Sequence, residues 1–430
     1  MIRITKTGCA FEKEPLSAPF GFKGGYVDEL WQSIVAMEDE EGNRGLGLGV
    51  QSVLWSDPLV FQACGHERGN NLMSGITRHA LRAAEGLSFK TPFSLINALL
   101  ATSSQFSSAS WGSSLRRTFL LNALVPIDQA AWMLTHFTKP LASFKDLIPP
   151  DYHSALTANH DRIACVPAVS YGMSEEDVEE LVRNGSFVLK IKLGSDPDGD
   201  GDEGKMLAWD RDRLHNIHQR VKHYETQYTD NGFVAYYLDF NGRYTTRDQL
   251  NRLTGAADRM GALERILLVE EPFQEHLQYD VRDFPFRVTG DESVHSEEDA
   301  LERIEMGYGA FALKPVAKTM SLSLRIAGLA AERGIPCFCA DLTANPLMVD
   351  WNKNLAAHLP PVPGLSVGLI ESNGAQNYSN WNQMKRFHPR SGAEWMEPID
   401  GLFRLSADFY SSLGGVFERS AHYNSLVFAS

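Results

Sequence analysis

Eight short apolar runs recur between residues 160 and 372, and longer segments of helical periodicity separate them. The runs occupy residues 163–172, 187–194, 233–242, 266–273, 286–293, 311–316, 336–343 and 365–372. Strands that alternate with helices in this way are typical of a (β/α)₈ barrel with a parallel sheet. A doubly wound open sheet is the alternative, but no GxGxxG motif follows the first run, which disfavours it.

The segments on either side of this repeat differ from it. Residues 1–150 combine a hairpin, expected at 30–37 and 45–55, with amphipathic helical stretches, and we assign them to an α+β domain. Residues 151–385 hold the barrel, and the segment 386–430 is expected to pack back on the N-terminal domain. The predicted fold class is therefore α/β, a modified TIM (β/α) barrel with an N-terminal α+β domain that the C-terminal segment completes.

Composition and charge argue against several classes of function. The net charge of −14 disfavours nucleic acid or an anionic membrane as the main partner. No signal peptide is read and no run of about 18 apolar residues occurs, so we expect a cytoplasmic protein without a membrane span. The 5 cysteines are scattered along the chain, which predicts reduced thiols rather than a disulfide framework.

The acidic segment 196–205 begins like a calcium-binding loop. Its twelfth position is Leu207, where such a loop needs a bidentate glutamate. We therefore expect a solvated loop inserted after the second run.

Charged side chains stand where the runs end, and the carboxyl ends of barrel strands carry the reactive groups. The polar residues at these ends are Lys190, Lys192, Asp239, Asn241, Glu270, Glu271, Asp291 and Lys314. Lys190 and Lys192 point to the same side of their strand because side chains alternate with period two. Carboxylates on three consecutive strand ends would repel one another, so a hard divalent cation such as Mg²⁺ is expected between them.

Five short motifs carry these residues: KIK at 190–192, DFN at 239–241, VEEP at 269–272, GDES at 290–293 and LKP at 313–315. Together, and in this order, they resemble the enolase superfamily. The narrower resemblance is to the muconate lactonizing enzyme (muconate cycloisomerase)-like subgroup of the mandelate racemase/muconate lactonizing enzyme family. The chain resembles the mandelate racemase subgroup less closely. That subgroup has a histidine at the end of the seventh strand, and this chain has none there.

The resemblance implies that a lysine removes the proton α to a carboxylate with Mg²⁺ as cofactor, a strategy for which this superfamily is a standard example. Three carboxylates match the metal ligands: Asp239, Glu270 and Asp291. Lys192 matches the base on one face of the substrate, and Lys314 matches the base or cation on the opposite face. Lys190 matches the residue that contacts the substrate carboxylate and disfavours a proton on Lys192. Asn241 and Glu271 are supporting candidates.

Two lysines on opposite faces favour racemisation or epimerisation of a small carboxylic acid or amino-acid derivative, because that reaction uses both. Cycloisomerisation, or dehydration by syn-elimination, remains open, with one lysine as the base and the other as a spectator cation. A lysine that forms a Schiff base, as in aldolases, and a non-catalytic binding barrel are more distant alternatives. We expect a small-molecule carboxylate as the ligand and a homo-oligomer as the assembly.

Specificity in this family comes from loops of the N-terminal domain, which caps the barrel, and from the last strands. Phe20, Phe22 and Trp55 either cover an apolar part of the substrate or pack between the domains. Asp341 and Glu371, at the ends of the last two strands, are candidates to bind a cation or hydroxyl groups. Dipeptide epimerases of the family carry Asp-x-Asp on the eighth strand, whereas this chain has Leu-Ile-Glu-Ser there, which argues against a dipeptide substrate.

Overall fold

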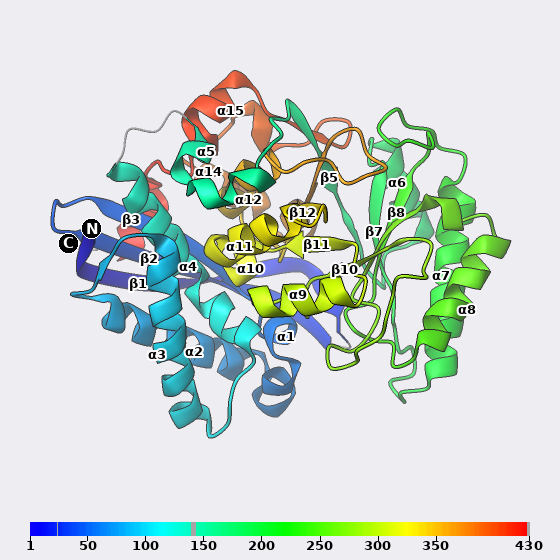
Figure 1. The fold of residues 1–430 in the computed structure, drawn as a ribbon, viewed down its shortest axis with the longest axis horizontal. Helices are drawn as coiled ribbons and strands as arrows, with labels where there is room; N and C mark the ends of the chain where they lie inside the picture. The colour runs from blue at the N-terminus through cyan, green and yellow to red at the C-terminus, as the bar shows by residue number, and fades with distance from the viewer. Residues whose placement is uncertain (24, 139–142, 428–430) are drawn as a thin grey trace.

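The computed structural model describes residues 1–23, 25–138 and 143–427. An N-terminal α+β domain and a β/α barrel lie at opposite ends of the molecule in Figure 1. Four antiparallel strands form the N-terminal sheet in the order β3-β2-β1-β4. They are β1 (Ile2–Phe22), β2 (Gly25–Asp39), β3 (Arg44–Gln51) and β4 (Ser88–Phe89).

The hairpin predicted at 30–37 and 45–55 is present as β2 and β3, which pair antiparallel. Its second strand ends at Gln51, earlier than predicted, because helix α1 already begins at Val53. The sequence does not predict β1, since many of its side chains are exposed or half-buried and its apolar pattern is weak. The N-terminal sheet is therefore larger than the hairpin alone.

Four helices pack on one another and on this sheet. They are α1 (Val53–Ser56), α2 (Pro58–Ala84), α3 (Pro92–Trp111) and α4 (Arg117–Phe137). A Cβ atom on Gly47 of β3 would lie 1.8 Å from the Pro126 carbonyl oxygen of α4. The Gly-Leu-Gly-Leu-Gly sequence of β3 therefore lets α4 lie directly against the sheet backbone.

The predicted barrel is confirmed, with every predicted run contributing a strand. The strands are β5 (Arg162–Val166), β6 (Ala168–Val169), β7 (Val188–Lys192), β8 (Ala235–Asp239), β9 (Ile266–Glu270), β10 (Arg287–Gly290), β11 (Ala310–Leu313), β12 (Cys337–Cys339) and β13 (Gly368–Glu371). β5 and β6 are one strand interrupted at Pro167; β5 pairs in parallel with β13, and β6 pairs in parallel with β7. This pairing closes the sheet into a ring of eight parallel strands. A further strand, β14 (Leu402–Arg404), lies antiparallel to β5.

Helices follow most of the barrel strands. They are α6 (Glu175–Arg183), α7 (Glu203–Val221), α8 (Arg247–Arg259), α9 (Glu297–Glu305), α10 (Pro315–Lys318), α11 (Met320–Ala331) and α12 (Pro346–Ala356). Ser174, Thr246 and Ser296 cap α6, α8 and α9 through their side-chain oxygens, as such residues before acidic first turns predict. Residues 271–286, between β9 and β10, form a connection without a helix. The acidic segment 196–205 forms a largely exposed loop that leads into α7.

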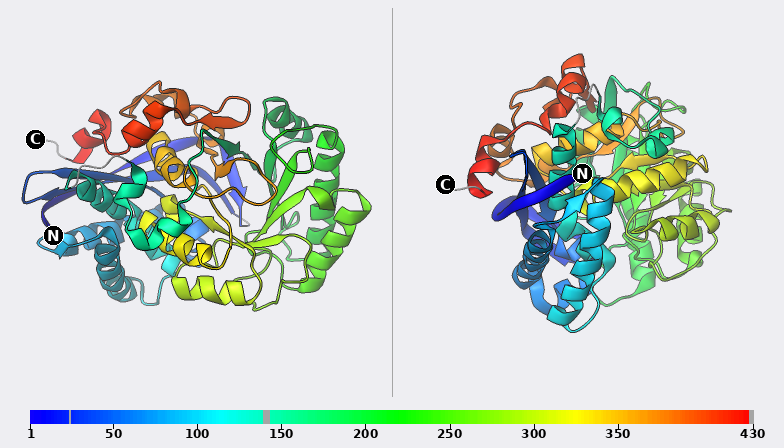
Figure 2. Two further views of the ribbon diagram at one scale, coloured as in Figure 1. Left: turned by 45° about the horizontal axis from the view of Figure 1, so that its top comes forward. Right: turned by 60° about the vertical axis from the view of Figure 1, so that its left-hand side comes forward.

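Short helices flank the barrel in the chain, and the C-terminal ones return to the N-terminal sheet (Figure 2). They are α5 (Phe144–Leu147), α13 (Gly374–Asn377), α14 (Trp381–Arg386), α15 (Ala407–Ser412) and α16 (Ala421–Val427). α16 packs on β1 and β2, where His422 Nε2 lies 3.0 Å from a carboxylate oxygen of Glu12. Within the described ranges, no helix has both the length and the hydropathy needed to cross a membrane.

The tip of the β1–β2 hairpin lies over the carboxyl ends of the barrel strands. Its apolar side chains, among them Phe22 and Leu30, belong to the same buried cluster as Leu313 and Leu342 of the barrel. The two domains therefore share a core at the barrel mouth.

Candidate active site at the barrel mouth

The barrel mouth places two lysines opposite each other. Lys192 is the last residue of β7 and Lys314 directly follows β11. β7 and β11 are separated by β8, β9 and β10 on one side of the ring and by the other three strands of the barrel on the other side. Both lysines are buried, and both line one small cavity of about 40 Å³.

Lys190 lies deeper, among carboxylates from three strands. Its Nζ is 3.1 Å from Asp239 Oδ2, 3.1 Å from Glu270 Oε1 and 2.9 Å from Glu371 Oε2. Burial lowers the pKa of Lys190, but the carboxylates outweigh burial and hold this pKa well above its usual value. Lys192 donates to Asp239 and to Asn241 Oδ1, the latter at 3.0 Å. The two lysines of β7 therefore share Asp239.

Asp291 is bound by two lysines from the segment that follows β11. Lys314 donates to Oδ2, and Lys318 donates to Oδ1 at 3.1 Å and to the Asp291 carbonyl oxygen at 2.8 Å. Burial raises the pKa of Asp291, but Lys314 and Lys318 outweigh it and hold the pKa below its usual range. Sequence reasoning missed Lys318; its only signal is the position four residues after Lys314, one turn along a helix.

Three carboxylates converge beside these lysines: Glu270, Asp291 and Glu292. One oxygen of each lies within 4.8 Å of the others, and all three side chains are buried. Glu292 Oε2 is buried without a hydrogen-bond partner among the described residues. A buried carboxylate oxygen that lacks a donor, next to two further carboxylates, fits a hard divalent cation. Asp239, by contrast, is outside this group in the structure, because Lys190 and Lys192 hold it.

The carboxylates of this acidic group have pKa values that are shifted in opposite directions. Burial raises the pKa of Glu270 to about 8, although Lys190 opposes the shift. Burial raises the pKa of Glu292, but Lys23, Lys314 and Lys192 together outweigh burial and lower this pKa to about 2. Sequence reasoning missed Glu292, although the adjacent acids of the GDES motif are the signal that could have pointed to it.

The tip of the β1–β2 hairpin supplies a lysine to the acidic group. Lys23 Nζ lies 3.2 Å from Glu292 Oε1 and 3.1 Å from the Trp55 carbonyl oxygen. Phe20, Phe22 and Trp55 line the small cavity, and the Trp55 ring lies 4.5 Å from Lys314 Nζ. These contacts come from a different domain, so sequence position alone gives no signal that Lys23 meets Glu292.

Asn241 and Glu271 hold the turns that follow β8 and β9. Asn241 Nδ2 donates to Glu292 Oε1 at 2.8 Å, and Glu271 Oε1 accepts from the Ser293 N–H at 2.9 Å. Both residues have positive φ, 47° and 40°, in turns that aim side chains into the mouth. Burial raises the pKa of Glu271 to about 7, and nearby Glu292 adds to the shift.

Asp341 and Glu371 line the side of the cavity formed by the last two strands. Glu371 Oε2 accepts from Lys190 and, at 3.0 Å, from the Asp341 N–H. The Asp341 carboxylate accepts N–H groups of Ala344 and Asn373 at 3.0 and 2.8 Å. Burial raises the pKa of Asp341 to about 6, and Glu371 contributes. Asp341 therefore serves the local turn as well as the cavity wall.

Comparisons with known proteins agree with this geometry. Residues 174–371 match the family described as enolase C-terminal domain-like. No curated protein sequence matches the chain. The solved structures that share its fold include the three described next.

A dipeptide epimerase from Enterococcus faecalis V583, complexed with Mg and the dipeptide L-Leu-L-Tyr, has a TM-score of 0.67 and 19% identity over 96% of this chain and 99% of its own. A mandelate racemase/muconate lactonizing protein from Herpetosiphon aurantiacus has a TM-score of 0.66 and 16% identity over 94% and 96%. An N-succinyl Arg/Lys racemase from Bacillus cereus ATCC 14579 has a TM-score of 0.60 and 16% identity over 88% and 89%. Residues 174–371 of this chain are thus similar to the enolase C-terminal domain-like family, and the chain as a whole has the fold of mandelate racemase/muconate lactonizing proteins.

Proposed function

We propose that this protein is a Mg²⁺-dependent racemase or epimerase that moves the proton α to a carboxylate. The observation that carries the proposal is the opposed pair Lys192 and Lys314, which line one cavity from opposite sides of the ring. Two bases on opposite faces of one carbon are what a 1,1-proton transfer requires. Racemases and epimerases among the structures that share the fold support the same reading.

The residues that would hold the cation are Glu270 and Asp291, with Asp239 or Glu292 as the third carboxylate. A cation bound there would supply positive charge beside the substrate carboxylate, where negative charge grows as the α-proton leaves. Lys192 Nζ would take the proton from one face of the α-carbon, and Lys314 Nζ would return a proton to the other. Lys190 would place its ammonium near the substrate carboxylate.

A lysine acts as a base only when its amine is unprotonated. Burial lowers the pKa of Lys314, but the nearby carboxylates, of which Asp291 has the largest effect, together outweigh burial and raise this pKa above the usual value. Lys314 must therefore lose its contact with Asp291 before it accepts a proton. Asp291, one of the residues that would hold the cation, is thus also the residue whose contact keeps Lys314 protonated.

The substrate class that fits best is an amino acid acylated on its nitrogen. One solved structure that shares the fold is an N-succinyl Arg/Lys racemase, and another is an epimerase complexed with a dipeptide. The cavity of this chain has aromatic side chains on one wall, and Glu371 and Asn373 on another. An acylated amino acid has no α-ammonium, which agrees with the absence of Asp-x-Asp at the end of β13.

Deuterium exchange tests the proposal. The protein is incubated with Mg²⁺ in D₂O and a panel of N-succinyl amino acids and dipeptides of both configurations, and NMR follows the α-proton. We expect Lys192→Met to abolish exchange from one enantiomer and Lys314→Met to abolish it from the other. Lys205→Met, in the first turn of α7 next to the exposed acidic loop, is the matched control and should exchange like the wild type. Exchange that survives the double replacement of Lys192 and Lys314 would show that other groups are the bases.

A further inference from the structure

A buried carboxylate of the N-terminal domain binds the barrel next to the lysines of the site. Asp128 lies in the middle of α4, is 0% exposed, and forms no ion pair with a described lysine, arginine or histidine. Its Oδ2 accepts the Ser321 N–H at 3.0 Å, and its Oδ1 accepts the Ser321 hydroxyl. A carboxylate buried without a cation is costly, so it depends on its donors, which are Ser321 and the Met320 backbone in the first turn of α11 and the Trp132 side chain of α4.

The residue that precedes α11 has an unusual backbone conformation. Thr319 has φ 74° and ψ 148°, a region that is otherwise almost confined to glycine. Its hydroxyl accepts the Leu322 N–H at 3.1 Å and caps α11. Such a conformation persists only where the surroundings impose it, and Asp128 binds the chain two residues later.

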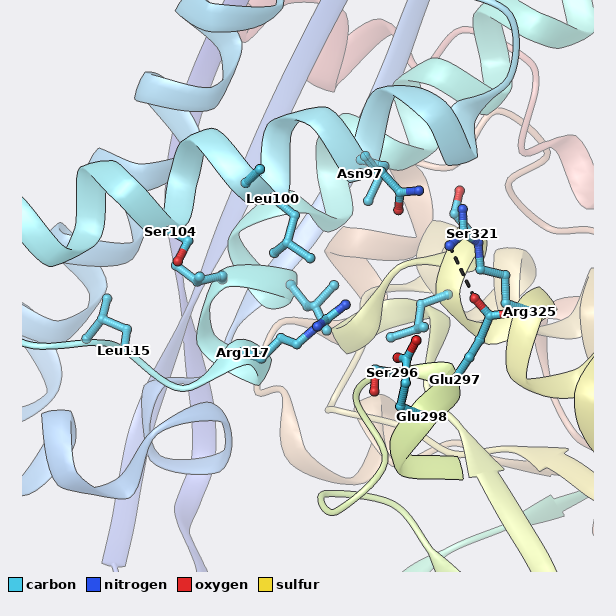
Figure 3. A pocket seen from close by; sticks show the side chains of 15 residues that line it. Asn97, Leu100, Ser104, Leu115, Arg117, Ser296, Glu297, Glu298, Ser321 and Arg325 are labelled. Atoms are coloured by element: carbon cyan, nitrogen blue, oxygen red, sulfur yellow. Dashed lines mark hydrogen bonds and ion pairs between the residues drawn. The ribbon is translucent and has the colours of Figure 1, made fainter. Parts of the chain in front are cut away.

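The same turn fixes the lysines that reach Asp291. Lys318 is the residue before Thr319, and Lys314 lies at the start of α10, which packs against α4. Asp128 is therefore connected to Asp291 by a chain of contacting or bonded residues, Ser321, Thr319 and Lys318. Figure 3 shows Ser321 at the domain boundary, on a cleft of about 530 Å³ that Asn97 and Leu100 of α3 line from the other side.

We propose that Asp128 is a positioning residue, which holds the Thr319 turn through Ser321 and so sets Lys314 and Lys318 against Asp291. The N-terminal domain then orients one of the two opposed lysines, while Lys192 is held within the barrel by β7 and by its contacts with Asp239 and Asn241. This inference rests on the proposed function for its catalytic meaning, but the positions of the lysines can be measured without a substrate.

The substrate-free test is lysine labelling. Wild type, Asp128→Asn and the milder Ser321→Ala are treated briefly with acetic anhydride, and mass spectrometry compares the labelling rates of individual lysines. We expect both variants to label Lys314 and Lys318 at least threefold faster than the wild type, with Lys190 and Lys192 changed less than twofold. The control is Gln129→Met, since Gln129, the next residue of α4, accepts the Leu48 N–H inside the N-terminal domain. Equal acceleration of all four lysines, or none, in the folded variants would overturn the proposal.

Deuterium exchange, measured separately for the two faces of the substrate, then tests the catalytic role of this positioning. With the N-succinyl amino acids and dipeptides in D₂O, Asp128→Asn should slow exchange from the Lys314 face at least tenfold and from the Lys192 face less than twofold. An equal loss on both faces would show a merely structural role and contradict the proposal. If the wild type exchanges no member of the panel, the proposed function fails, and the labelling ratios still decide whether Asp128 positions the lysines.

Discussion

Two regions of this protein bury a lysine next to a carboxylate, and they do so in different ways. In α12, Lys353 Nζ lies 2.7 Å from Asp350 Oδ1, and both side chains are 1% exposed. Asp350 Oδ2 accepts the Trp395 indole N–H at 2.8 Å, and Lys353 also donates to the Trp395 carbonyl oxygen at 2.7 Å. This cluster joins one turn of a helix to the C-terminal segment.

The barrel mouth instead gathers its charges from many strands, and they share partners. Lys190 contacts three carboxylates, Asp291 contacts two lysines, and one oxygen of Glu292 has no donor among the described residues. The α12 cluster is arranged to hold two segments together. The charged groups of the mouth share several partners each, an arrangement that suits the proposed proton transfer and cation binding because a group can change one partner for another.

Removing Lys353 should have the largest effect on stability. Lys353→Met leaves Asp350 buried with no lysine, so we expect the free energy of unfolding to fall by about 3–5 kcal/mol in urea titrations. The control is Lys385→Met, which removes a partly exposed ion pair with Glu397 and should change this free energy by less than about 1 kcal/mol. A small loss for Lys353→Met would remove the contrast between the two clusters.

The two regions should also differ in how stability depends on pH. Burial raises the pKa of Asp341 to about 6, above its value in the unfolded chain. The folded protein therefore binds this proton more tightly than the unfolded chain does, and the folded state loses stability as pH rises from about 4 to 6. Burial raises the pKa of Asp350, but Lys353 and His388 together outweigh burial and lower this pKa. The contribution of Asp350 to stability is therefore present above about pH 4 and is lost as pH falls.

Unfolding of Asp341→Asn and Asp350→Asn between pH 3.5 and 7 measures this difference. Relative to the wild type, the free energy of unfolding of Asp341→Asn should rise by at most about 3 kcal/mol as pH rises. This limit follows because a shift of one pKa unit corresponds to about 1.4 kcal/mol. Asp350→Asn should show the opposite slope. Parallel curves for the two variants would contradict the assignment of opposite shifts.

Mg²⁺ should stabilise the folded protein, and this effect should depend on the carboxylates of the barrel mouth. At a Mg²⁺ concentration about 100 times the dissociation constant, the free energy of unfolding should rise by about 2.7 kcal/mol, and EDTA should reverse the change. Thermal unfolding with and without the ion measures it. Glu270→Gln and Asp291→Asn should lose the increase, whereas Lys385→Met should keep it.

The smallest effect expected is that of Glu270→Gln on the metal-free protein. Because the pKa of Glu270 is raised to about 8, this side chain is mostly protonated at pH 7 and an amide resembles it. The free energy of unfolding in EDTA should therefore change by less than about 1 kcal/mol, even though deuterium exchange is lost. A large destabilisation would show that Glu270 is an ionised partner of Lys190 in the folded protein.

Much of the fold could be predicted because its signals are local. The apolar runs that became β7, β8 and β9 are short and end in charged residues, so the strand ends marked Lys192, Asp239 and Glu270. The strand β1 escaped prediction because little of it is buried, and its partner strand rather than its own pattern defines it.

The rest of the site depends on contacts between distant segments. Lys23 reaches Glu292 only because the hairpin tip lies over the barrel mouth. Lys318 competes for Asp291 because of the turn at Thr319. No periodicity in the sequence records either contact, and single residues without a motif give no reason to select them.

The side of the cavity formed by the β1–β2 hairpin has a consequence for how such a protein can diverge. Phe20, Phe22 and Lys23 belong to the hairpin tip, whereas Lys192 and Lys314 belong to the barrel. Exchange of the hairpin between relatives by recombination would thus alter one wall of the cavity and leave the two opposed lysines in place, provided that the lysine in contact with Glu292 is kept. A library of chimeras at this one hairpin would explore new substrates at little cost to the chemistry.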